Sequence, residues 1–237
     1  MFSNNNRGYT IIRSKAKETA SFMSQVYGWM TGGIFISGLT AYAIASNPQA
    51  MMYLTQSRGA FLALFVFQIV AVIALSGWVQ RMSVFMASAV FILYATLVGV
   101  TFSTLFLLYT MESISLAFFA TSTAFAGLSI FARVTKRDLG PLGSFCMIGL
   151  FGMIAVVLIS MLVPSMMTNS LQLTLAVIGV LVFAGLTAYD TQRIKSLQYQ
   201  FNTADSSRKG AIYGALILYL DFINLFINIL RLMGDRR

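Results

Sequence analysis

Apolar segments long enough to cross a lipid bilayer recur along almost the whole chain, and they constrain its fold more than any other feature. A helix needs about 20 apolar residues to span a hydrocarbon core of about 30 Å. Seven segments of this kind run over Phe22–Ala45, Ala60–Val79, Val84–Tyr109, Ile114–Ala132, Leu142–Val163, Leu171–Tyr189 and Ala211–Met233. Because the linkers between them are short, the sequence predicts an all-α integral membrane protein, built as a seven-transmembrane helical bundle.

Composition supports this interpretation. Of the 237 residues, 58% are hydrophobic and only 10% are charged, which leaves too little polar surface to cover a water-soluble core. We therefore expect three parts: a polar N-terminal segment over residues 1–21, a seven-helix transmembrane domain over residues 22–233, and a short polar tail over residues 234–237.

Basic residues alternate between successive linkers, which predicts the orientation. One set of connections carries Arg7, Arg13, Lys15, Lys17, Arg81, Arg133, Lys136, Arg137, Arg193, Lys195, Arg208 and Lys209. By the positive-inside rule these connections and the N-terminus lie in the cytoplasm. Arg231, Arg236 and Arg237 favour the same side for the tail, which leaves open whether the last helix spans fully. The net charge of +9 is therefore explained by basic residues that set the membrane orientation and contact anionic lipid headgroups. No nucleic-acid partner is expected.

Missing residue types exclude several classes of enzyme. The chain has no histidine and one cysteine, Cys146, inside the fifth apolar segment. A zinc protease, a haem or copper site, a Ser/His dyad and a disulfide are therefore excluded. The 14 methionines and 20 phenylalanines are typical of packing and lipid contact. We expect no enzymatic activity and no organic cofactor.

Two aspartates stand out, because carboxylates are costly in lipid. Asp190 follows the sixth apolar segment, and Asp221 lies ten residues inside the seventh. The sixth segment places small residues on the face that leads to Asp190, among them Ala176 and Gly179. Contact between the two carboxyl groups requires either that the sixth helix continues past Asp190 or that the seventh begins later.

The last segment carries one polar stripe. At 100° per residue, a single band about 100° wide contains Gly210, Gly214, Asp221, Asn224, Asn228 and Arg231. Gly210 and Gly214 form a GxxxG pair, which permits close helix packing. The two asparagines are open to a second interpretation, as hydrogen bonds between helices. The stripe should face protein or water, which predicts a central position for the last helix.

Two motifs carry a family resemblance. The run LYLDFINLFINILR, from Leu218 to Arg231, closely resembles the C-terminal signature of the Bax inhibitor-1 family, also called the transmembrane Bax inhibitor motif family. The run AYDTQRIK, from Ala188 to Lys195, is similar to its companion motif at the end of the sixth helix. The resemblance covers essentially the whole chain and implies a seven-helix fold with the last helix central.

For bacterial-type members, the resemblance also implies a pH-sensitive calcium leak through the inner membrane, governed by aspartates at the positions of Asp190 and Asp221. It further implies a basic partner at the cytoplasmic end of the second helix, for which Arg81 is the best candidate. Alternatively, Arg81 is only one of the cytoplasmic basic residues that set the orientation of the chain in the membrane.

The physics of a carboxyl pair favours the same function. Two carboxylates in a low-dielectric site do not both ionise cheaply, so they share one proton and titrate as a unit. The singly protonated pair can tie two helices together, whereas the doubly ionised pair repels or binds Ca²⁺ transiently, since this cation prefers oxygen ligands. Ca²⁺, H⁺ and membrane lipid are thus the expected partners, with Asp190 and Asp221 as the transient metal ligands.

Two other functions stay open. Paired intramembrane aspartates also occur in intramembrane aspartyl proteases, but those enzymes place Gly-x-Gly before the second aspartate, where this chain has Tyr219 and Leu220. Alternatively, the chain is an interaction protein, because the resembled family includes members that modulate a membrane-bound AAA protease or a stress response. That role would use surfaces such as residues 7–18.

Overall fold

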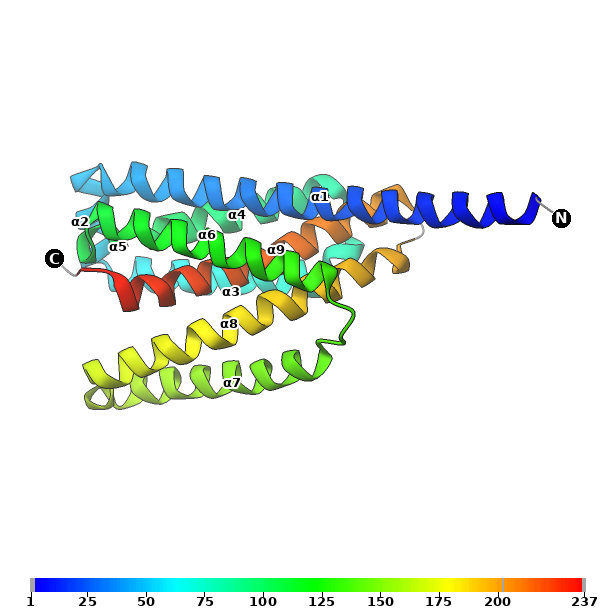
Figure 1. Ribbon diagram of the computed structural model, residues 1–237. Helices are drawn as coiled ribbons and strands as arrows, with labels where there is room; N and C mark the ends of the chain where they lie inside the picture. Colours follow the sequence, from blue (N-terminus) through cyan, green and yellow to red (C-terminus); the bar gives the residue numbers. More distant parts are fainter. Residues whose placement is uncertain (1–2, 202, 236–237) are drawn as a thin grey trace.

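The computed structural model describes residues 3–201 and 203–235, and every regular element in these residues is helical. The α-helices are α1 (Ser3–Ala45), α2 (Pro48–Gln56), α3 (Arg58–Trp78), α4 (Val84–Phe102), α5 (Leu105–Leu108), α6 (Met111–Val134), α7 (Gly140–Leu162), α8 (Asn169–Leu197) and α9 (Ala204–Met233). Short 3₁₀ turns are η1 (Val79–Arg81), η2 (Pro164–Met166) and η3 (Gln198–Gln200). The long helices run roughly along one axis (Figure 1).

The connections between the helices lie at the two ends of the bundle (Figure 1). What we call the basic end carries the α3–α4, α6–α7 and α8–α9 connections, with the predicted basic clusters, and α1 projects beyond it. The opposite end carries α2, α5, the α7–α8 connection and the C-terminal end of α9. The backbone N–H of Asp235 donates to Ser113 Oγ at 3.0 Å, which holds Asp235, two residues after the end of α9, against the start of α6.

Polar caps set the helix boundaries. Ser83, Thr110, Thr168 and Thr203 each accept a hydrogen bond from a backbone N–H in the first turn of the helix that follows. A cap satisfies donors that a helix terminus leaves unpaired, so helices begin at these residues. Thr203 is part of a full capping box with Ser206, which starts α9 seven residues before the predicted Ala211.

Three features of the helices were not predicted from the sequence. The third segment is interrupted between α4 and α5, where Ser103 Oγ and Thr104 Oγ1 donate to the carbonyls of Val100 and Thr101. Such back-bonding competes with the helical ladder and bends the chain. The helix α2, capped by Asn47 with Pro48 in its first turn, lies in a linker for which no element was predicted. The polar N-terminal segment is helical from Ser3 and continuous with the first predicted apolar segment.

Six helical segments in the described residues are long and apolar enough to cross a membrane: α3 with η1, α4 with α5, α6, α7, α8 with η3, and α9. The helix α1 is not among them, so this count is six where the sequence predicted seven spans. Burial differs strongly between these segments, from 11% of the most apolar window in α7 to 72% in α9. The helix α9 packs against α1, α3, α4, α6 and α8, whereas α7 packs mainly on α8.

Candidate functional site

Asp190 lies inside α8, seven residues before the helix ends at Leu197. The helix continues past it because the polar residues that follow bind the α6–α7 connection. Gln192 Oε1 accepts from the backbone N–H of Leu139, and Gln192 Nε2 donates to the carbonyl of Arg137, both at 2.9 Å. The apolar segment ended at Tyr189, but the helix continues past Asp190, which is one of the two arrangements that contact between the carboxyl groups requires, and Asp190 is buried.

Asp221 is buried in the middle of α9, with 4% of its surface exposed. Its Oδ2 atom has no hydrogen-bond partner in the described part of the chain. The carboxyl groups of Asp221 and Asp190 are close enough to interact electrostatically across the α8–α9 interface, and the Cys146 thiol of α7 also lies within range of Asp221. The structure thus brings together the two aspartates that the sequence singled out.

The cation beside this pair is Arg193. Its Nη1 atom lies 3.8 Å from Asp190 Oδ1, one helical turn further along α8. Because half of the Arg193 side chain is exposed, water screens this interaction. The structure does not bring Arg81 to the pair: Arg81 is exposed in η1, and it forms no ion pair with either aspartate among the described residues.

The other residues of the polar stripe follow Asp221 toward the opposite end. Asn224 Nδ2 donates to the carbonyl of Leu220 at 2.8 Å, and Asn228 Nδ2 donates to the carbonyl of Asn224 at 2.7 Å. Both amide nitrogens therefore bond within α9, and not between helices. Asn228 is buried against Gly179 of α8, and its Oδ1 has no partner in the described residues. Arg231 is exposed and lines a cavity of about 530 Å³ at the opposite end.

The glycine pair of α9 lies against its neighbours on the basic side of Asp221. A Cβ atom on Gly214 would lie 2.8 Å from Ile194 of α8 and 3.3 Å from Val26 of α1. A Cβ atom on Gly210 would meet the ring of Phe201. Because glycine has no side chain, these two positions allow α8 and α1 to approach α9 closely.

In the described residues, no group of three or more acidic, cysteine or histidine side chains is placed to hold a metal ion. Two carboxylates supply only part of the six to eight oxygen ligands that Ca²⁺ prefers. Asp190 and Asp221 alone therefore do not complete a calcium site.

Comparisons with known proteins agree with the motifs. The family model described as "Inhibitor of apoptosis-promoting Bax1" matches residues 19–237. The chain belongs to the Bax inhibitor-1 family. Its relatives include the inner membrane protein YbhL of Escherichia coli, which is 40% identical over 98% of both chains. A protein of Lactococcus lactis, YrjE, is 33% identical over 97% of both chains, and a membrane protein of Streptococcus pyogenes is 31% identical over 90% of this chain and 92% of its own. The chain is an integral membrane protein.

One contact in this Bax inhibitor-1 family chain was not predicted. Tyr219, two residues before Asp221, is fully buried, and its hydroxyl lies 2.6 Å from Ser37 Oγ of α1. Ser37 Oγ in turn donates to the carbonyl of Ala95 in α4 at 2.7 Å. This chain of hydroxyls ties α9 to α1 and α4. The available signal was a polar hydroxyl within the motif LYLDF, but nothing in the sequence indicated its partner.

Proposed function

We propose that this protein is a pH-sensitive leak channel for calcium, and that Asp190 and Asp221 form its gate by sharing one proton. The observation that supports this proposal is the burial of both carboxyl groups at one helix interface, with Asp221 Oδ2 unpaired in the described residues. An unpaired buried carboxylate is costly, so a role in ion or proton movement explains it better than packing does.

The arrangement suggests where the proton resides. Arg193 stabilises negative charge on Asp190, so the shared proton lies mainly on Asp221. In this singly charged state the pair holds α8 against α9 and the path is occluded. Loss of the proton places two like charges in a low-dielectric interface, which repel each other and attract a divalent cation. Calcium flux should therefore increase as the pH rises through the titration of the pair.

The proposed path needs a defined topology. We propose seven spans, with the apolar part of α1 as the first and α9 at the centre, since α9 is the most deeply buried of the candidate spans. The N-terminus and the basic end then face the cytoplasm, and the C-terminus lies outside. The inner membrane is the proposed location, because the relative YbhL is named an inner membrane protein.

The experiment is calcium flux into liposomes that contain the purified protein, measured at several pH values between about pH 5 and pH 8. Asp190→Asn and Asp221→Asn should each abolish the pH dependence. The matched control is Asp205→Asn, which removes the same charge from an exposed position in the first turn of α9. Flux that equals that of empty liposomes would overturn the proposal and favour the modulator of a membrane protease, whereas cleavage of a transmembrane substrate would favour the aspartyl protease.

A further inference from the structure

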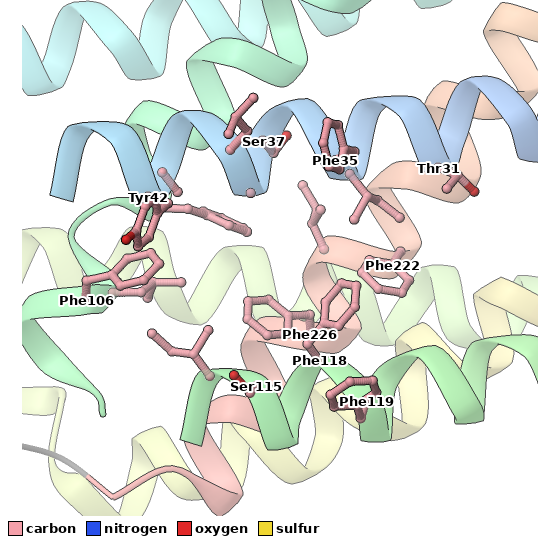
Figure 2. A pocket seen from close by; sticks show the side chains of 18 residues that line it. Thr31, Phe35, Ser37, Tyr42, Phe106, Ser115, Phe118, Phe119, Phe222 and Phe226 are labelled. Atoms are coloured by element: carbon pink, nitrogen blue, oxygen red, sulfur yellow. The ribbon is translucent and has the colours of Figure 1, made fainter. Parts of the chain in front are cut away.

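An apolar groove lies between α1 and α6, with α9 at its floor. The cavity has a volume of about 640 Å³, within the range of ligand pockets. Figure 2 shows aromatic side chains of α1, α5, α6 and α9 around it, with Phe106 of α5 beside Tyr42 at one end. Phe35 of α1 and Phe119 of α6 are 70% and 67% exposed, whereas Phe222 and Phe226 of α9 are almost fully buried. The groove is therefore continuous with the lipid-facing surface of the bundle and reaches inward to α9.

The lining is apolar and carries no charged side chain. Of its few hydroxyl groups, that of Ser37 is already bonded to Tyr219 and Ala95. Figure 2 shows the hydroxyl groups of Tyr42 and Ser115 toward one end of the groove and Thr31 at the other end. An occupant of the groove must therefore be almost wholly apolar.

The length and depth of the groove fit one leaflet of a bilayer. Along α1 it extends from Thr31 to Tyr42, about 16 Å at 1.5 Å per residue. Half of a hydrocarbon core of about 30 Å is about 15 Å. Tyr42 lies three residues before the end of α1, and Ile114 lies three residues after the start of α6, so the groove begins at the opposite end of the bundle. It then extends inward to about the middle of the membrane.

These dimensions distinguish between occupants. A helix of a second copy is about 10 Å across, too thick to reach side chains at the floor such as Phe222, of which only 5% is exposed. A single hydrocarbon chain is far thinner. We propose that the groove binds one acyl chain of a membrane phospholipid from the leaflet at the opposite end, with the terminal methyl group near Phe222 and the headgroup beyond Tyr42.

Gly38 provides a way to fill the groove without disturbing the bundle. It lies in the wall of the groove on α1, and a Cβ atom there would meet no other atom within 4 Å. A larger side chain can therefore extend into the cavity without a clash at its base. Gly32 is the matched control, because it is also exposed on α1 and open around its Cβ position, but it does not line the groove.

The test uses the full chain in vesicles of phosphatidylethanolamine and phosphatidylglycerol, with a trace of phosphatidylcholine that carries a diazirine near the end of one acyl chain. After irradiation, labelled residues are mapped by mass spectrometry. We expect label on Phe222, Ile223 or Phe226 in the unchanged chain, which lipid outside the groove does not reach. Gly38→Phe should lose the label on α9 and keep that on exposed rim residues, and Gly32→Phe should keep both.

Three results would overturn the proposal. The first is label confined to the exposed rim in the unchanged chain. The second is label on α9 that persists in Gly38→Phe and also in Ser115→Phe, which fills the groove from α6. The third is label on α9 from a diazirine fatty acid but not from the phospholipid, which would assign the groove to a free fatty acid instead.

Discussion

At the residue scale, Arg193 and Arg208 stand in the same relation to an aspartate. Each lies three residues after it on one helix, with Nη1 3.8 Å from Oδ1. Asp190 is nearly buried, whereas the side chain of Asp205 is 75% exposed. The arginine should therefore stabilise the negative charge on Asp190 but have little effect on Asp205, because water screens the exposed pair.

Arg193→Gln tests this difference. Without the guanidinium, the negative charge on Asp190 is less stabilised, so the pair should keep its shared proton to higher pH. The midpoint of calcium flux against pH should move upward, by up to about one pH unit given the partial exposure of Arg193. Arg208→Gln is the control and should leave the midpoint unchanged.

Arg81→Gln distinguishes the two candidate cations. Arg81 is exposed in η1 and has no ion pair with the aspartates in the described residues, so its loss should not move the midpoint. A shift with Arg81→Gln as large as that with Arg193→Gln would show that Arg81 reaches the pair in another state of the protein.

Tyr219→Phe removes one hydroxyl from the tie between α9, α1 and α4. Ser37 keeps its bond to Ala95, so only the bond donated by Tyr219 is lost, and the free energy of unfolding should fall by about 1 kcal/mol or less. Denaturant unfolding in detergent measures this change. Tyr27→Phe on α1 is the control, because the buried Tyr27 hydroxyl has no hydrogen-bond partner in the part of the chain that the structure describes, and an equal loss there would contradict the assignment.

At the element scale, the α8–α9 interface depends on close approach at Gly179. A Cβ atom at this position would lie 2.5 Å from Cγ and Oδ1 of Asn228. Gly179→Ala should therefore push the two helices apart and reduce the free energy of unfolding by about 1–3 kcal/mol, although alanine favours the helix by up to about 1 kcal/mol.

The clash predicts a specific rescue. Adding Asn228→Ala to Gly179→Ala should restore most of the lost stability, because it removes the atoms that the new methyl group meets. Gly127→Ala in α6, where a Cβ atom meets nothing within 4 Å, is the control. Gly179→Ala alone with unchanged stability would show that the interface is looser than this spacing indicates.

Hydropathy was a good guide to these elements but a poor guide to their ends. It located the apolar parts of α3, α6 and α7 within a few residues, because lipid requires a long apolar run. It ended the sixth helix at Tyr189, although α8 continues to Leu197 through polar residues that bond to the α6–α7 connection. Tertiary hydrogen bonds of this kind leave no periodic signal in the sequence.

The same limit applies to the site. Asp190 and Asp221 could be selected from sequence, because charge inside an apolar segment is costly enough to need a reason. The location of Arg193 was visible as well, but its role as the nearby cation depended on how far α8 continues. The link from Tyr219 to Ser37 joins residues 182 positions apart and required the fold.

At the scale of the whole molecule, charge is distributed unequally between the two ends. The basic end carries eight lysines and arginines in its connections, from Arg81 to Lys209, whereas the charged side chains described at the opposite end include Arg231 and two acidic residues, Glu112 and Asp235. By the positive-inside rule, the basic end should face the cytoplasm.

Cysteine accessibility in intact cells tests this orientation. Cys146 is buried and can be replaced by alanine to give a background without cysteine. Ser165→Cys in η2 and Ser196→Cys near the end of α8 are then nearly isosteric, and both positions are exposed, at opposite ends of the bundle. A membrane-impermeant maleimide should label the first from outside and the second only after the membrane is permeabilised. The reverse pattern would place the basic end outside, and the proposed gate of Asp190 and Asp221 would then sense the external pH instead of the cytoplasmic one.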